Sequence, residues 1–179
     1  MAGTGALVVL SDGLLKAFPP VAADDAHTLV LGSMPGEASL RAGQYYAHPR
    51  NAFWFVMAEL TGVPAEAPYA ERLHGLRRAG IALWDVLHAC EREGSLDAAI
   101  VDATSVPHDF AAFFRAHPGI RRVFFNGAKA EQCFRRQVMG RQAVPDGLVL
   151  ERLPSTSPAH AGMSLPLKVA AWRARLAVS

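Results

Sequence analysis

The chain has 179 residues, of which 51% are hydrophobic and 19% charged, so it can bury a sizeable core and is not a disordered protein. The formal net charge of +2 permits a nucleic-acid partner without requiring one. The two cysteines, Cys90 and Cys133, exclude a four-cysteine iron–sulfur cluster and form no metal-ligand pattern, which predicts a reducing cytoplasm. We expect no transmembrane helix, because no apolar run approaches ~20 residues, and no signal peptide, because no basic segment precedes the apolar N-terminal stretch.

The chain is expected to form a single domain over 1–179, in which residues 1–26 are an N-terminal extension without a clear pattern. A short helix is predicted near Leu7–Phe18, where Pro19 and Pro20 would stop it. From Thr28 onwards, apolar runs typical of buried strands alternate with helical patterns. The predicted strands are Thr28–Leu31, Ile81–Leu87, Arg122–Phe125 and Leu148–Leu153, and the predicted helices are Ala52–Thr61, Tyr69–Ala79, Asp109–Ala116, a segment from Gly127 to Val138, and Leu165–Leu176.

This alternation predicts an α/β fold with a parallel sheet covered by helices on both faces. In such sheets, ligands bind at the carboxyl ends of the strands. The polar and glycine-rich segments all follow predicted strand ends, and we therefore expect them to converge on one edge of the sheet. These segments are Gly32–Gly36, Trp84–Asp85, Asn126–Gly127 and Pro154–His160.

The segment Gly32-Ser33-Met34-Pro35-Gly36 has glycines that let the backbone approach a ligand closely, although alone it is more typical of a simple strand-to-loop turn. It is not a Walker loop, because no Gly-Lys-Ser/Thr follows. It is not a dinucleotide-binding fingerprint either, because the third glycine is absent and no helix is expected to start immediately after it.

The segment from Gln44 to Trp54 is dense in aromatic, amide and basic side chains. An aromatic ring can stack on a base, Asn51 can orient a water molecule, and Arg50 can hold a phosphate. The alternative is a polar loop in which Asn51 caps the following helix while Phe53 and Trp54 lie in the core. We favour the core for Phe53 and Trp54, whereas both interpretations of Asn51 can hold together.

The segment Leu153–His160 contains prolines that stiffen it and small hydroxyls that can bond to phosphate oxygens. The alternative is an ordinary linker into the last helix, with His160 as a surface residue.

Three of these segments, in this order, resemble the signature segments of the uracil-DNA glycosylase superfamily. They are Gly-Ser-Met-Pro-Gly at 32–36, Tyr-Tyr-Ala-His-Pro-Arg-Asn-Ala-Phe-Trp at 45–54 and Leu-Pro-Ser-Thr-Ser-Pro-Ala-His at 153–160. The strand at 80–87 and the turn at 125–130 also match, so the resemblance extends from about Thr28 to the C-terminus. It implies a three-layer α/β/α sandwich around a short central parallel sheet of about four strands, and a monomeric enzyme without metal or cofactor that acts on double-stranded DNA.

The resemblance is closest to the hypoxanthine-DNA glycosylase branch. The related mismatch-specific uracil/thymine glycosylases carry Gly-x-Asn-Pro-Gly, whose Asn positions the attacking water, and this chain has Met34 there. The hypoxanthine branch instead has Gly-Ser-Met-Pro-Gly and uses the Asn of a Pro-Arg-Asn segment, which is Asn51 here. The implied function is to flip out a deaminated base (hypoxanthine, with uracil or xanthine as further candidates) and to hydrolyse its N-glycosidic bond.

The resemblance also implies roles for individual residues. Asn51 is the expected catalytic residue, and Tyr46 would stack on the base. Trp84 or Asp85, at the end of the second predicted strand, would read the base, and Asp85 can instead cap a helix. The full set of base-binding candidates is Gly32, Ser33, Met34, Tyr46, Trp84, Asp85 and Asn126, and the set of DNA-binding candidates is Arg50, Lys129, Ser155, Ser157 and His160.

Three alternatives stay open from the sequence. The first is a G:U/G:T mismatch-specific uracil/thymine glycosylase that uses a different water-positioning group. The second is a catalytically inactive homologue that binds damaged DNA, which the thioether of Met34 favours. The third is a nucleotide-binding α/β protein unrelated to DNA, which the absence of a complete phosphate-binding glycine motif disfavours.

Overall fold

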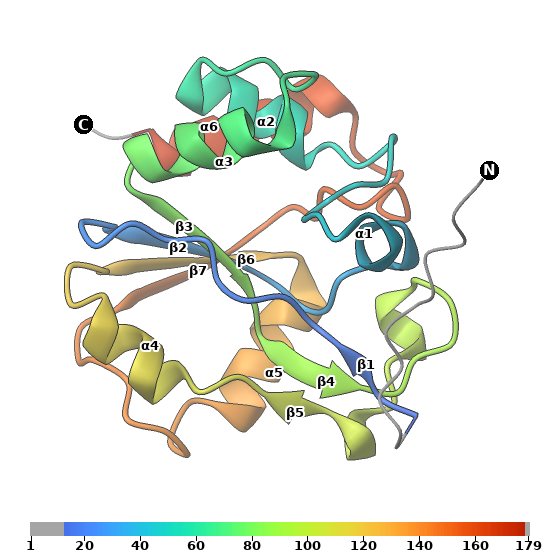
Figure 1. Ribbon diagram of the computed structural model, residues 1–179, viewed down its shortest axis with the longest axis vertical. Coiled ribbons are helices and arrows are strands. Elements are labelled where there is room, and N and C mark those ends of the chain that lie inside the picture. Colours follow the sequence, from blue (N-terminus) through green and yellow to red (C-terminus); the bar gives the residue numbers. More distant parts are fainter. Residues whose placement is uncertain (1–12, 178–179) are drawn as a thin grey trace.

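The computed structural model describes residues 13–177 and is built on a four-stranded parallel sheet (Figure 1). The strands lie in the order β3-β2-β6-β7, and each neighbouring pair is parallel. This confirms the predicted central sheet, with strand ends that differ by one residue or two. The strands are β2 (Thr28–Gly32), β3 (Ile81–Asp85), β6 (Arg122–Asn126) and β7 (Val149–Leu153).

Helices cover both faces of this sheet, which confirms the three-layer α/β/α sandwich (Figure 1). Successive side chains of a strand point to opposite faces. Val30 therefore packs with Trp172 in one apolar cluster, whereas Leu31 packs with Phe134 in the other. The first face carries α2 (Phe53–Thr61), α3 (Tyr69–Arg78) and α6 (Leu165–Leu176), and the second carries α4 (Phe110–Ala116) and α5 (Ala128–Gln137).

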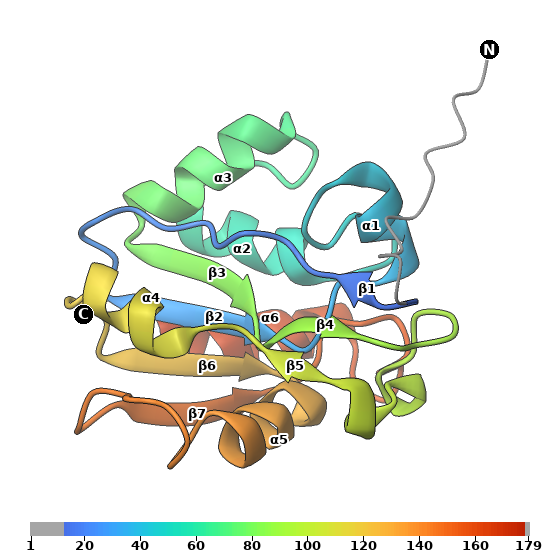
Figure 2. The same ribbon diagram turned by 60° about the horizontal axis from the view of Figure 1, so that its bottom comes forward.

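A second, antiparallel sheet extends from one end of the molecule and was not expected from the sequence (Figure 2). It contains β1 (Leu15–Lys16), β4 (Leu87–Cys90) and β5 (Val106–Pro107). The prediction of one strand over Ile81–Leu87 is therefore wrong in its last part. β3 ends at Asp85 and the chain enters β4 at Leu87, but Val86 and Leu87 are both fully buried, so the apolar pattern has no break at this change of sheet.

The predicted helix at Leu7–Phe18 is also wrong where it can be compared. Its residues 7–12 lie outside the described part of the chain, and Leu15 and Lys16 form β1, which pairs with β4. Pairing with a strand more than 70 residues away overrides the local pattern. Residues 13–26 belong to the packed fold, since Leu15, Val21 and Ala26 are buried and the backbone of Val21 bonds to that of Leu83.

A short helix, α1 (Glu37–Ala42), starts directly after Gly36, where the sequence was expected to continue as a loop. Its last turn is closed by Gly43, which has a left-handed backbone (φ 63°). Two single-turn 3-10 helices, η1 (Asp97–Ala99) and η2 (Asp102–Thr104), follow β4. Within residues 13–177, no helix is long and apolar enough to cross a membrane.

Candidate active site

A cleft of about 750 Å³ lies at the carboxyl ends of the parallel strands. Residues from all four of the predicted polar segments line it, together with the loop that precedes α2 and with η1. The expected convergence on one edge of the sheet is thus observed. Lining residues from the predicted set are Gly32, Ser33, Met34, Tyr46, Arg50, Asn51, Asp85, Asn126, Ser155, Ser157 and His160.

Tyr46 has the only left-handed backbone among the non-glycine residues of the described chain (φ 53°). This conformation costs on the order of 1 kcal/mol or more and persists only where surrounding contacts hold it. The ring of Tyr46 stacks on Phe53, with centroids 4.0 Å apart and planes 23° apart. Its hydroxyl oxygen accepts a hydrogen bond from Nδ2 of Asn126 at 3.1 Å. These two contacts hold the ring of Tyr46 at the cleft and maintain its strained backbone.

The amide of Asn126 joins three segments of the cleft to one another. Besides the bond to Tyr46, Nδ2 donates to Oγ1 of Thr156 at 2.8 Å. Oδ1 accepts from the backbone N–H of Thr156 at 2.9 Å. Both amide hydrogens are thus already donated within the protein. Asn126 therefore acts as a positioning residue, and its amide group has little donor capacity left for reading a base.

Asp85 ends β3 with its carboxyl group almost fully buried, 3% of the residue being exposed. Among the described residues, Oδ2 has no hydrogen-bond partner. The carboxyl fits only because Gly32 has no side chain, since a Cβ on Gly32 would lie 2.4 Å from Oδ1 of Asp85 and 2.9 Å from the Tyr46 hydroxyl. Burial raises the pKa of Asp85 to about 7; the charge of Asp97 adds to this increase, and Arg92 opposes it.

Trp84 is not part of the cleft, although the sequence placed it beside Asp85 as a base-binding candidate. Its indole packs in the apolar cluster between the sheet and helices α4 and α5, and it stacks on His108 with ring centroids 4.1 Å apart. Its Nε1 donates to the backbone oxygen of Phe18 at 3.0 Å. Of these two adjacent strand residues, only Asp85 lines the cleft.

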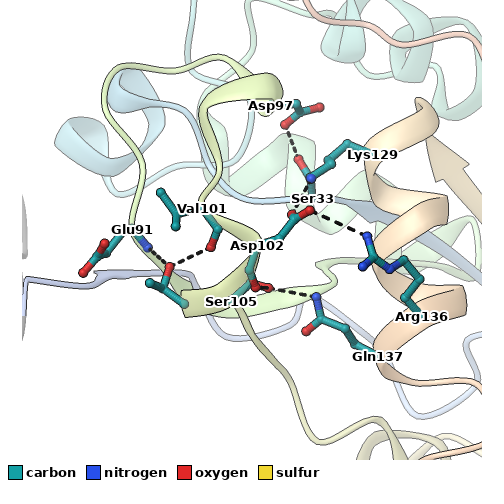
Figure 3. Close-up of polar contacts among 10 residues, drawn as sticks. Ser33, Glu91, Asp97, Val101, Asp102, Ser105, Lys129, Arg136 and Gln137 are labelled. Carbon is teal, nitrogen blue, oxygen red and sulfur yellow. Dashed lines mark hydrogen bonds and ion pairs between the residues drawn. The ribbon is translucent and has the colours of Figure 1, made fainter.

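Asp97, which lines the cleft, and Arg92, which supports its wall from outside the lining, were not expected from the sequence. Oγ of Ser33 donates to Oδ1 of Asp97 at 2.5 Å (Figure 3). Nη2 of Arg92 donates to the backbone oxygen of Pro35 at 2.7 Å. Both side chains hold the loop at 32–36 in place, yet they come from a stretch without a motif, 57 to 64 residues further along the chain. No local pattern indicates such contacts.

Asn51 lines the cleft directly before α2. Its Oδ1 accepts from the backbone N–H of Phe53 at 3.0 Å, so it satisfies a backbone donor at the start of the helix. The N-cap position itself is occupied by Ala52, so Asn51 supports the start of α2 from one residue further out than the capping interpretation expected. Phe53 and Trp54 lie in the core, as expected. The described contacts of Asn51 leave both Nδ2 hydrogens and one Oδ1 lone pair available to a water molecule or ligand.

The loop after β7 carries Ser155, Ser157 and His160 along the cleft. The Ser155 hydroxyl accepts from the backbone N–H of Ser157 at 3.2 Å, and the Ser157 hydroxyl accepts from that of Ala159 at 3.2 Å. The two hydroxyls shape the loop as acceptors and keep their O–H groups as donors. His160 is exposed.

Lys129 does not line the cleft, but lines a neighbouring hollow to which Ser155 also contributes. Its Nζ donates to Oδ1 of Asp102 at 2.6 Å, and Asp102 also pairs with Arg136 at 3.6 Å (Figure 3). Its charge is thus partly compensated by a neighbouring carboxylate. Within residues 13–177, no group of three His, Cys, Asp or Glu side chains is arranged to hold a metal ion.

Comparisons with known proteins agree with this geometry. The family model described as "Uracil DNA glycosylase superfamily" matches residues 19–175. Two curated proteins named hypoxanthine DNA glycosylase, from Methanosarcina barkeri and Methanosarcina acetivorans, are 39% and 37% identical over 116 residues, which is 64% of this chain and 72% of each relative. A solution NMR structure of a Methanosarcina acetivorans protein, described as a putative uracil DNA glycosylase, superposes with a TM-score of 0.75 at 32% identity and covers 91% of this chain and 96% of that one.

Proposed function

The chain belongs to the uracil-DNA glycosylase superfamily, and on that premise we propose that it is a monofunctional DNA glycosylase that removes deaminated bases, with hypoxanthine as its main substrate. A base inside a duplex is out of reach of a cleft, so the nucleotide must first be flipped out at a cost of a few kcal/mol. Hydrolysis then breaks the bond between C1′ and the base nitrogen. The bonding electron pair leaves with the base, water oxygen bonds to C1′, and the proton released from water ends on the base.

The observation that carries this proposal is the shared cleft of Tyr46, Asn51 and Asp85, with the loop at 32–36 along its wall. Tyr46 stacks on the flipped base, and Asn51 orients the water molecule below the sugar. The thioether of Met34 cannot orient water as an amide does, which supports Asn51 as the catalytic residue. The transition state resembles an oxocarbenium ion, as at other glycosidic bonds.

We further propose that the enzyme acts as a monomer on double-stranded DNA. Arg50, Ser155, Ser157 and His160 would contact the damaged strand from the rim of the cleft. Trp84 receives no role in base binding, because it packs in the core. We assign Lys129 no DNA contact within the cleft, because its side chain pairs with Asp102 outside the cleft.

The test is a panel of duplexes that carry hypoxanthine, uracil, xanthine or a thymine mismatch, with base release measured under single-turnover conditions. The wild type is expected to release hypoxanthine, and Asn51→Ala to lose at least about 100-fold in rate. The matched control is Asp109→Ala. Asp109 accepts from the Ala112 backbone N–H at 2.9 Å at the start of α4, outside the cleft. Both variants lose one such bond, about 1 kcal/mol, but only Asn51→Ala should lose activity.

Each contrary outcome has a distinct meaning. A near wild-type rate for Asn51→Ala would show that the catalytic assignment is wrong. Release of uracil or mismatched thymine without hypoxanthine would identify a uracil/thymine glycosylase. Binding to abasic DNA without release of any base would identify an inactive homologue, and affinity for free nucleotides without affinity for duplex DNA would identify a nucleotide-binding protein.

A further inference from the structure

The carboxyl group of Asp85 has hydrogen-bonding capacity that the described protein leaves unused. Its Oδ2 is buried without a partner, although the residue lines the cleft. Asn126, the other polar side chain at a strand end of the cleft, has already donated both amide hydrogens to Tyr46 and Thr156. An unpaired polar atom in a buried site is costly unless a ligand supplies the missing partner. Asp85, and not Asn126, is therefore the side chain that can hydrogen-bond to the polar edge of a base bound in the cleft.

The surroundings of Asp85 favour the neutral carboxylic acid over the carboxylate. Burial of the carboxyl group is the main cause that disfavours its charged form, and the negative charge of Asp97 on η1 adds to this effect. Arg92 is the nearby cation, but it does not form a salt bridge with Asp85, and it donates to the backbone oxygens of Pro35 and Gly94. The other titratable or charged side chains that line the cleft are Glu37, Arg41, Tyr45, His48, Arg50 and His160.

Deamination changes the hydrogen-bonding edge of a base in one defined way. The amino group of adenine or cytosine is a donor, and the carbonyl oxygen that replaces it is an acceptor. A neutral carboxyl group presents one O–H donor, whereas a carboxylate presents acceptors alone. A neutral Asp85 is thus matched to the carbonyl of a deaminated base, and an ionised Asp85 would repel it.

We propose that Asp85, as a neutral carboxylic acid, donates a hydrogen bond to the carbonyl oxygen of the flipped deaminated base, and that loss of its proton stops base release. This role rests on the glycosylase function proposed above. When the bond to C1′ breaks, its electron pair moves onto the base and increases the negative charge on the carbonyl oxygen. The hydrogen bond from Asp85 strengthens as this charge develops, and it thereby lowers the barrier. An ionised carboxylate at the same place would oppose the departure of the base.

The experiment measures single-turnover release of hypoxanthine from a duplex with one deoxyinosine between pH 5.5 and 9. The wild-type rate is expected to be constant at low pH and to fall about tenfold per pH unit above neutrality, as for one ionising group. Asp85→Asn has the same shape and keeps an N–H donor at every pH, so its rate should lie within about tenfold of the low-pH wild type and should not fall. Asp85→Ala should lose about 100-fold or more at every pH.

Asp97→Asn supplies a second, independent readout. It keeps an oxygen that accepts from Ser33 but removes the charge that disfavours ionisation of Asp85. The fall in rate should therefore move to lower pH, a shift that a purely structural role of Asp85 would not produce. A wild-type rate that is independent of pH, or an Asp85→Asn variant that titrates like the wild type, would overturn this role alone. A wild type that releases no base from any duplex would overturn the proposed function, and this role with it.

Discussion

The amide nitrogen of Asn126 donates to the hydroxyl of Tyr46 at 3.1 Å and so links the end of β6 to a residue 80 positions earlier in the chain. Together with the two bonds to Thr156, this contact ties the loop before α2 to the loop after β7. Tyr46 keeps its left-handed backbone in this setting. The walls of the cleft therefore depend on one largely buried amide, which in our proposal does not read the base.

Replacement of Asn126 by alanine should destabilise the protein and disorder the cleft. The buried backbone N–H of Thr156 would lose its acceptor, and the Tyr46 hydroxyl would lose its donor. We expect a loss of about 2–3 kcal/mol in the free energy of unfolding, measured by urea denaturation, and slower base release. Gln137→Ala is the control, because it removes an amide bond to Ser105 outside the cleft. A variant Asn126→Ala within about 0.5 kcal/mol of the wild type would contradict this prediction.

Gly32 should tolerate no side chain. A Cβ at this position would lie 2.4 Å from Oδ1 of Asp85 and 2.9 Å from the Tyr46 hydroxyl, distances that require one of the two groups to move. Gly32→Ala is expected to lower stability by about 1–3 kcal/mol and to impair base release together. Gly36→Ala in the same loop is the folding control, because its Cβ would meet Ser95 at an ordinary 3.6 Å. Equal thermal stability of both variants would show that the packing of Asp85 on Gly32 is not tight.

The sequence was sufficient to predict the central sheet, because its strands are short apolar runs bounded by turns and helices. The predicted bounds of the last helix, Leu165–Leu176, agree with α6, which has Pro166 in its first turn. The second sheet was not predictable in this way. Ile81 to Leu87 is an apolar run apart from Asp85, and only contacts with distant strands show that the chain changes sheet at Val86.

The same distinction between local sequence patterns and contacts with distant residues applies to the candidate site. Tyr46, Asn51 and Asp85 stand in or beside segments that resemble a known family, and all three line the cleft. Asp97 and Arg92 were missed because their partners, Ser33 and Pro35, are more than 50 residues away and no motif joins them. Trp84 and Asp85 are adjacent in β3, and their side chains point to opposite faces of the sheet. The sequence pattern did not indicate which of the two faces the cleft, so both were candidates for base binding.

Arg50 is exposed at the rim of the cleft, and we expect it to contact a phosphate. Arg50→Ala should weaken duplex binding by a similar factor for every sequence and should reduce the slope of log affinity against log salt by about 1. Binding titrations at several salt concentrations measure both quantities. Arg78→Ala, an exposed arginine at the end of α3, is the charge-matched control. The same slope for both variants would exclude a phosphate contact by Arg50.

The buried carboxyl of Asp85 should also make stability depend on pH. Burial raises its folded pKa from 3.8 to about 7, so the folded state binds the proton more tightly than the unfolded state. This contribution to stability is fully present below pH 4 and is lost as pH rises through 7. At about 1.4 kcal/mol per pKa unit, the loss is on the order of 4 kcal/mol at most.

His108 acts in the opposite direction, because burial lowers its pKa to about 3 and makes the folded state less stable as pH falls below 6.5. The pH dependence of the wild-type free energy of unfolding therefore contains contributions from both groups. The difference in this free energy between wild type and Asp85→Asn isolates the contribution of the carboxyl group. We expect Asp85→Asn to gain stability relative to the wild type as pH rises from 4 to 8, measured by urea denaturation at each pH. A difference between the two proteins that stays constant over this range would mean that Asp85 is ionised in the folded protein at an ordinary pKa, and the pH dependence of base release would then need another group.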